Sequence, residues 1–463
     1  MSGISNLFNI GTSSLFAFQE SLSVTAHNIA NVNTKGYSKQ DVILSETLPL
    51  NGRPGQIGTG VEVKTIKRNV DLFVNSQILS SKQQLGKNGA SQNALSNIES
   101  LFDDSKNQSL GTGLNDFFNA IQDVSTDPSN VTARSVLLSK AQTLTDRFHQ
   151  ADTTLTAQRQ SLDQEVDQSI TTINSLAKQI ADLNDKISQA ELSGQNANDL
   201  RDQRQQVVNS LGEQINVATV EDGTGQLSVF VGSGQSLVEK NRVHTLSGVA
   251  NSSNSGLLDV DYNGGGTPVS ISSVISGGRL KGLLDARDTT IPATLTKLDT
   301  LASNLVSEIN TQHKLGYGLD GSTGLNFFTS SGVTAKSISV SLTDGKKVAA
   351  SDSAAGVPGN NVNALALGNL QHKSITALGS VTLNTYYQTT VSDVGSAAQQ
   401  ASQDLEAQQD LQDQLDAQWS QISGVSLDEE LVHMLTFQRA FEASSKVVVM
   451  ADELMQTILT LKR

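Results

Sequence analysis

The sequence of 463 residues contains no cysteine, only six prolines and one tryptophan, and 17% of its residues are charged. Without cysteine there is no disulfide scaffold, no thiolate zinc site and no cysteine nucleophile. Acidic residues outnumber basic ones by 46 to 32, which gives a formal net charge of −14. Because such a chain has no basic surplus to neutralise phosphates, we expect no nucleic acid partner.

Long hydrophobic runs are absent as well. The longest, such as residues 447–451, fall far short of the roughly 18 apolar residues that span a bilayer, so we expect no membrane insertion. The first lysine is Lys35, and the basic start of a secretory signal peptide is therefore missing. We expect export by another route, without a cleaved signal peptide.

The usual signatures of catalysis and metal binding are also missing. The six histidines form no HxxxH or HExxH pair, and there is no phosphate-binding loop, nucleophile elbow or dinucleotide fingerprint. Residues 319–324 lack the alternating oxygen ligands of a calcium loop, so a turn is expected there. The charged residues of segment 199–204 are expected to pair locally on a helix. We therefore predict no enzyme, no catalytic residue, no metal and no cofactor.

The two ends of the chain carry a seven-residue apolar repeat. It is formed near the N-terminus by Phe8, Leu15, Leu22 and Ile29, and near the C-terminus by Leu427, Met434, Phe441, Val448 and Met455, with Leu431 and Ile458 beside them. This spacing is typical of a coiled-coil seam, although a core helix with a wider stripe is an alternative. Polar Ser444 and Ser445 narrow the stripe and favour the seam. Neither stripe can be buried without a partner, so we expect the two ends to pack together.

Between the ends, helical and strand patterns alternate. Helices are predicted over about 160–192, where Val166, Ile173, Ile180 and Ile187 form a row, and over 198–211, 291–314 and 394–422. Residues 215–217 and 227–231 read as a hairpin, and 337–342 alternate as a strand does.

The expected fold class is α+β, with long helical coiled-coil or bundle rods from paired N- and C-terminal segments and a β-rich middle domain. Three domains are predicted. The first is a terminal, inner coiled coil of 1–35 with 428–463. The second is a helical rod of 36–214 with 286–330 and 391–427. The third is a β-rich outer domain of 215–285 with 331–390.

Two terminal stretches resemble a known family. Residues 26–40, AHNIANVNTKGYSKQ, resemble the NIANxNTxGY signature of flagellar rod, hook and hook-associated proteins. In it, Asn28, Asn31 and Asn33 are local hydrogen-bonding residues that end a helix, and Gly36 gives the backbone freedom for the turn before Tyr37. Residues 423–463 resemble the matching C-terminal helix, which Ser426 is expected to cap.

Motifs in the middle of the chain resemble those of one particular family among the axial proteins. Residues 58–77 follow the GxGVxVxxIxRxxDxF pattern of the axial families, and 199–204 resemble an LxDQR helix. Residues 277–288 and 310–328 resemble GGxLxGLLxxRD and NxxHxxGxxLDGxxGxxFF of the hook-associated protein 1 family. These two blocks are not expected in a hook or distal rod protein, which is the alternative within the axial families. A secreted coiled-coil adhesin is the alternative from another class.

The resemblance implies a structural subunit of the bacterial flagellum, extracellular at the hook–filament junction and required for filament assembly. It also implies export through the flagellar type III apparatus. The implied partners are further copies in an axial homo-oligomer, the hook protein, hook-associated protein 3 and a flagellar export chaperone. The residues expected to carry assembly are Phe8, Leu15, Leu22, Asn28, Ile29, Asn31, Asn33, Gly36, Tyr37, Leu427, Leu431, Met434, Phe441, Val448, Met455 and Ile458.

Overall fold

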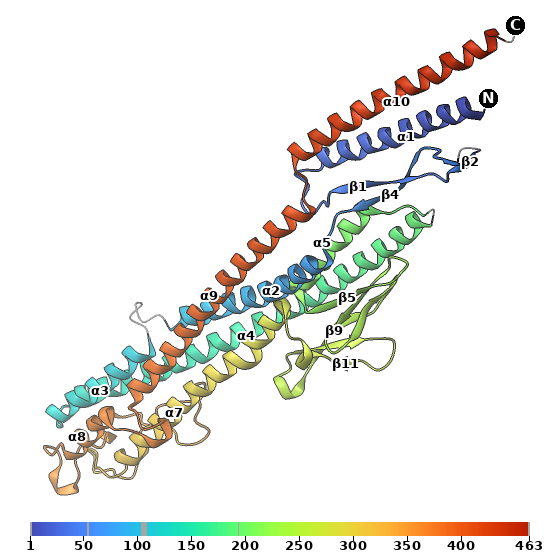
Figure 1. The fold of residues 1–463 in the computed structure, drawn as a ribbon. Helices are drawn as coiled ribbons and strands as arrows, with labels where there is room; N and C mark the ends of the chain where they lie inside the picture. The colour runs from blue at the N-terminus through green and yellow to red at the C-terminus, as the bar shows by residue number, and fades with distance from the viewer. Residues whose placement is uncertain (1, 53–54, 103–108, 193, 462–463) are drawn as a thin grey trace.

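The structure is a computed structural model that describes residues 2–52, 55–102, 109–192 and 194–461. The molecule is elongated, with a two-helix arm at one end, a helical rod, and a small β domain on one side of the rod (Figure 1). The α+β class with long paired terminal helices is confirmed. Among the described residues, no helix is both long enough and apolar enough to cross a membrane.

The arm consists of α1 (Ser2–Ala30) and α10 (Leu427–Leu461), which lie side by side and antiparallel (Figure 1). The predicted pairing of the two ends is therefore present. At the start of α10, Ser426 Oγ accepts a hydrogen bond from the backbone amide of Glu429 over 3.5 Å. Three acidic residues in the first turn, 428–430, add a favourable interaction with the helix dipole.

A β-hairpin runs beside α1, in a segment for which the sequence predicts helical rod. It consists of β1 (Gln40–Glu46) and β4 (Val61–Arg68), paired antiparallel, with the short β2 (Leu50–Gly52) and β3 (Gly55–Ile57) beyond them. The helical prediction is wrong for residues 40–68. β-branched residues at 61, 63, 65 and 66, with charged residues between them, favour a half-buried strand over a helix.

The rod is built from eight helices of the described chain. They are α2 (Leu72–Leu101), α3 (Leu110–Thr126), α4 (Val131–Glu191), α5 (Asn198–Gln214), α6 (Gly278–Asp285), α7 (Ile291–His313), α8 (Val362–Asn369) and α9 (Leu383–Ser423). Polar side chains begin four of them, because Asp71, Ser109, Asn130 and Thr382 accept hydrogen bonds from first-turn amides of α2, α3, α4 and α9.

The core of the rod follows one face of α4. The predicted row of Val166, Ile173, Ile180 and Ile187 is completely buried in it. At the far end of the rod, Phe117 packs against Phe327 and Phe328 with ring centroids 5.8 Å apart in both pairs. A second, small cluster of Val74, Ile78 and Leu415 lies between α2 and α9, nearer the arm.

The β domain packs against α4 through two small antiparallel sheets (Figure 1). One contains β5 (Val217–Glu221), β6 (Leu227–Val231), β7 (Gln235–Glu239) and β8 (Arg242–Val243). The other contains β9 (Thr245–Ala250), β10 (Leu258–Asn263) and β11 (Val269–Ser270). The predicted hairpin of 215–231 is confirmed as β5 and β6.

The prediction of a β-rich segment over 331–390 is wrong. These residues form isolated bridges, short 3₁₀ turns and α8, and α9 begins at Leu383. Ile338 and Leu342 are buried and Val340 is half-buried, so the alternation reflects an extended segment lying on the helices. Its backbone pairs only briefly with residues 327–329, through hydrogen bonds from the Thr329 amide to the Ser339 carbonyl and from the Ser341 amide to the Phe327 carbonyl. The Ile338 carbonyl instead bonds His149 Nε2 over 2.8 Å. A period of two thus marks one-sided burial here, with an isolated bridge in place of a strand.

Candidate assembly interface

The two helices of the arm pack closely because the residues at the centre of their contact have small side chains. A Cβ atom on Gly11 would lie 2.7 Å from Val448 Cγ2, so any larger residue there would have to displace the Val448 side chain. Further along, the rings of Phe18 and Phe437 stack with centroids 6.5 Å apart. The helices approach this closely because glycine, serine and threonine alternate with the large side chains on the α1 face.

The predicted assembly residues of the termini lie at and around this contact. Met434, Phe441 and Val448 of α10 are half-buried. The α1 row is displaced from the centre, because Leu15, Leu22 and Ile29 are half-buried and Phe8 is exposed, while Gly11, Ser21, Thr25 and Asn28 are buried. The remaining predicted residues of α10, namely Leu427, Leu431, Met455 and Ile458, are exposed. Apolar surface therefore remains uncovered on the arm.

The arm meets the rod at a polar joint, formed by the turn after α1 and the ends of α5, α9 and α10. Asn28 is at its centre and makes four hydrogen bonds. Its Nδ2 donates to the Gln40 carbonyl and to Glu430 Oε2, and its Oδ1 accepts from the Gln40 amide and the Tyr37 hydroxyl. Every donor and acceptor of this buried amide is thus satisfied. The second Glu430 oxygen lies 3.8 Å from Lys39 Nζ.

A second clasp fixes the turn to α5. Asp202 accepts hydrogen bonds from the Ser38 amide (2.8 Å) and hydroxyl (2.9 Å), and it pairs with Arg68 at 2.6 Å. Burial raises the pKa of Asp202, and Arg68 and Ser38 offset this only in part. Burial likewise raises the pKa of Tyr37, helped by nearby carboxylates such as Asp199.

The predicted local charge pairs within 199–204 are wrong, because the charged residues bind other segments. Arg201 pairs with Glu191 (2.8 Å) and Glu221, and Arg204 reaches Asn184 and Glu221. Sequence spacing gave no sign of these long-range contacts. The one signal in the sequence for these contacts was the concentration of charged residues at 199–204, in a chain that has few charged residues.

Other signature residues of the turn have local roles. Asn31 Nδ2 bonds the His27 carbonyl at the end of α1, as the sequence predicts for a helix end. Asn33 is exposed. Gly36 has a φ of +76°, and a Cβ there would lie 2.4 Å from the side chain of Gln206, which donates to the Lys35 carbonyl. Only glycine fits this turn.

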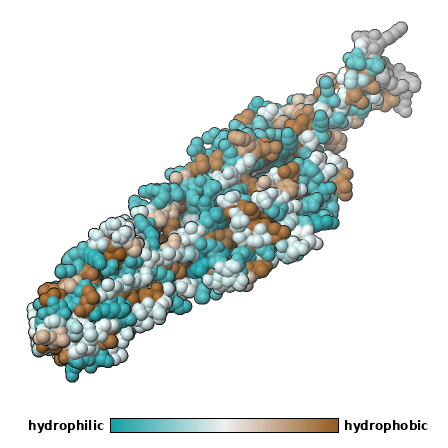
Figure 2. Space-filling model, turned by 90° about the horizontal axis from the view of Figure 1, so that it is seen from below, coloured by the Kyte–Doolittle hydropathy of each residue, from teal (hydrophilic) through white to brown (hydrophobic). Residues whose placement is uncertain are grey.

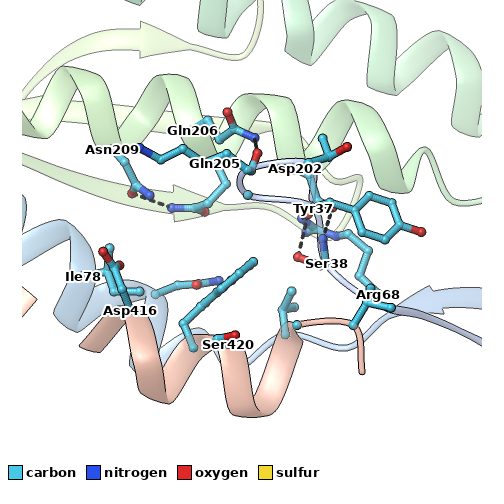
Figure 3. A pocket seen from close by; sticks show the side chains of 18 of the residues that line it. Tyr37, Ser38, Arg68, Ile78, Asp202, Gln205, Gln206, Asn209, Asp416 and Ser420 are labelled. Carbon is cyan, nitrogen blue, oxygen red and sulfur yellow. Dashed lines mark hydrogen bonds and ion pairs between the residues drawn. The ribbon is translucent and has the colours of Figure 1, made fainter. Parts of the chain in front are cut away.

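A cavity of about 580 Å³ opens at the joint. Figure 3 shows Gln205, Gln206 and Asn209 of α5 on one side of it, Asp416 and Ser420 of α9 on the other, and Ile78 of α2 at its edge. Its wall also includes the single tryptophan, Trp419. We call this space the joint cavity. In the described part of the chain, no three histidine, aspartate or glutamate side chains stand together as a set of metal ligands.

The comparisons with known proteins agree with an elongated axial subunit. The family described as "Flagellar hook-associated protein FlgK helical domain" matches residues 95–328. The families "Flagella basal body rod protein" and "Flagellar basal body rod FlgEFG protein C-terminal" match residues 8–37 and 418–461.

Individual relatives are similar over almost their full length. The chain is 28% identical to flagellar hook-associated protein 1 of Bacillus subtilis over 96% of each chain. It is 27% identical to that of Escherichia coli over 99% of this chain and 100% of the relative. The flagellar hook junction protein FlgK from Burkholderia pseudomallei has a similar fold, with a TM-score of 0.68 at 19% identity, covering 75% of this chain and 100% of that one.

The fold and the joint thus define an axial structural protein of the flagellum. The chain belongs to the flagellar hook-associated protein FlgK family, whose helical-domain model spans half of it. The resemblance read from the sequence is confirmed.

Proposed function

We propose that the chain forms the junction between the flagellar hook and the filament, and that filament assembly requires it. The observation that carries the proposal is the arm, in which the two ends of the chain pair and leave apolar side chains exposed on α1 and α10. Phe16 on α1 and Leu431 on α10 are both exposed in the single chain, and contacts with other subunits would bury them. The names of the relatives support a place at the hook.

Within this proposal the arm is the inner domain of an axial homo-oligomer, the rod surrounds it, and the β domain lies outermost. The neighbours along the axis are the hook protein and hook-associated protein 3. The protein reaches this extracellular position through the flagellar export apparatus.

An export chaperone is the proposed partner before assembly. The apolar face of α10, which includes Leu431, Met455 and Ile458, is exposed in the single chain and is an aggregation hazard. A helical chaperone covers such a face by helix-in-groove contact. Chaperone and assembly partner then compete for one surface. Titration calorimetry of Leu431→Asp against the chaperone tests this, and unchanged affinity would place the chaperone site elsewhere.

Deletion of the gene tests the junction role. We expect cells that make hooks and secrete filament protein into the medium, because nothing joins the two structures. Filaments of normal length on the deleted strain would contradict the proposal. Rescue by the unmodified chain, and failure of rescue by a chain lacking residues 427–461, would assign the role to the arm.

A further inference from the structure

Two large apolar side chains stand exposed at the start of α2, next to the joint. Leu72 is 79% exposed and Phe73 is 69% exposed. Asp71 precedes them and caps the helix, since its Oδ1 accepts hydrogen bonds from the backbone amides of Phe73 and Val74. We call this pair the Leu72–Phe73 knob. The cap fixes the backbone from which the two apolar side chains project.

The joint cavity lies on the other side of the same helix. Asn75, Ile78 and Lys82 of α2 line it. Because successive helical residues are turned by about 100°, the Phe73 side chain projects about 160° away from that of Asn75. Phe73 and the cavity therefore lie at the same height along the molecule and on opposite faces of α2, while Leu72, turned about 60° from Asn75, lies between them.

A projection on one face and a cavity on the opposite face allow copies that stand side by side in the same orientation to fit together. The face of one copy that carries the knob then meets the face of its neighbour that carries the cavity, and the contact repeats head to tail around an axis. We propose that the Leu72–Phe73 knob of one copy inserts into the joint cavity of the next. The inference rests on the proposed self-assembly and names the contact that sets its lateral register.

The chemistry of the cavity fits this occupant. Trp419 and Ile78 supply apolar wall, and the volume of about 580 Å³ accommodates two side chains. Lys35 and Lys82 line it without an ion pair to any described residue, while the carboxylate of Asp71 stands at the base of the knob. An inserted knob brings that carboxylate towards the lysines.

The charged residues of the lining balance one another, because Glu213 and Asp416 face the same space as the two lysines and Arg68 pairs with Asp202. Apolar side chains therefore enter a lining with no net charge. The carboxylate of Asp71 is the one charge that an inserted knob adds, and the nearby lysines favour it at the mouth of the cavity. The knob alone buries far less than the roughly 1,200 Å² of a stable interface, so it fixes register while the arm supplies area.

The absence of cysteine allows a direct cross-linking test. One version of the chain carries Phe73→Cys and a second, differently tagged version carries Asn209→Cys, and flagella are isolated from cells that express both. We expect a short bismaleimide to link the two versions to each other. The control replaces the first version with Leu315→Cys, which is 65% exposed at the far end of the rod, and is expected not to cross-link.

The outcomes separate this contact from the proposed function. If both versions are present in flagella but Phe73→Cys links to Asn209→Cys no better than Leu315→Cys does, the contact is overturned and self-assembly stands. If the unmodified chain never enters flagella, the proposed function fails and the contact fails with it.

A loss-of-function pair supports the test. Phe73→Ser is expected to leave the melting temperature unchanged, since the side chain is exposed, and to reduce incorporation into flagella about tenfold. Ser210→Trp, which fills the cavity from an exposed position on α5, should have the same effect. Phe73→Leu should retain most incorporation. Normal incorporation of both Phe73→Ser and Ser210→Trp would overturn the contact.

Discussion

The side-chain amide of Asn28 donates a hydrogen bond to Glu430 Oε2 over 3.1 Å and so joins two residues that are 402 positions apart in the sequence. Glu430 is almost completely buried between α1 and α10. A buried carboxylate needs such partners, because its desolvation is costly. The bond therefore ties the pairing of the two termini to the turn that begins the joint.

The first prediction follows from this bond. Asn28→Ala removes all four hydrogen bonds of the amide and leaves Glu430 with Lys39 alone, so it should destabilise the arm by roughly 2–4 kcal/mol. Amide hydrogen exchange at the start of α10 measures the effect. Asn31→Ala is the matched control, because Asn31 bonds only within its own helix end and should cost much less. Equal protection in both variants would contradict the central role of Asn28.

A second prediction concerns pH. Hydrogen bonds from Arg201 lower the pKa of Glu191 below its ordinary value of 4.5. A carboxyl group with a lowered folded-state pKa stabilises the fold above the unfolded pKa, and this contribution is lost as the pH falls through the folded value. Glu191→Gln should lower the free energy of unfolding by about 1–3 kcal/mol at pH 7, with a difference that shrinks below pH 4.5. Urea unfolding at a series of pH values provides the measurement.

Asp202 should behave in the opposite sense. Burial raises its pKa, so the ionised carboxylate is disfavoured in the fold and its protonation in mild acid costs no stability. As the pH falls, Asp202 is therefore expected to take up a proton before Glu191 does, and only the later protonation of Glu191 removes stability. A fall in the free energy of unfolding that accompanies the protonation of Asp202 would contradict this order.

The third prediction tests the turn after α1. Gly36→Ala places a Cβ where the φ of +76° disfavours it, at a cost of roughly 1–2 kcal/mol, and also against Gln206. Gly332→Ala, at a φ of +62° with no atom within 4 Å of the new Cβ, carries the backbone strain alone. Thermal unfolding should show a larger loss for Gly36→Ala. The difference between the stability losses of the two variants measures how much the close packing between the turn and α5 contributes.

A fourth prediction separates folding from assembly with two phenylalanines. Phe117→Ala opens the aromatic cluster at the far end of the rod and should cost roughly 3–5 kcal/mol. Phe16 is 73% exposed on the arm, so Phe16→Ala should leave the unfolding transition in place and reduce incorporation into flagella. A clear fall in melting temperature for Phe16→Ala would show that the residue already packs within the single chain.

The sequence predicted elements whose signal is local and repeated. The row through Val166 and Ile180 predicted the second half of α4 and its buried face, since burial on a long helix must recur with the helical period. The start of the helix at Val131, well before the predicted start near residue 160, was missed. For the termini the predicted pairing of the two ends is present, but the row predicted for α1 does not lie at the centre of the contact. Gly11, Phe18 and Thr25 share the spacing of Leu15 and Leu22 and lie nearer the centre of the contact.

The contacts at the joint could not be predicted from the spacing of residues in the sequence. Asp202 meets Ser38 and Arg68 only because three separate segments converge after folding. Nothing in the helix that carries Asp202 distinguishes a long-range clasp from a local pair. The residue types were visible, and their partners required the tertiary structure.

The chain crosses between arm and rod twice, at residues 69–71 after β4 and at 424–426 before α10. A single crossing would act as a swivel, because rotation about a few backbone bonds uncouples the two parts. Two crossings beside each other, bridged by the contacts of Asn28 and Asp202, remove that freedom. Torque applied to the arm is therefore transmitted to the rod through a closed loop of chain, and the subunit resists twisting about its long axis even where it can bend.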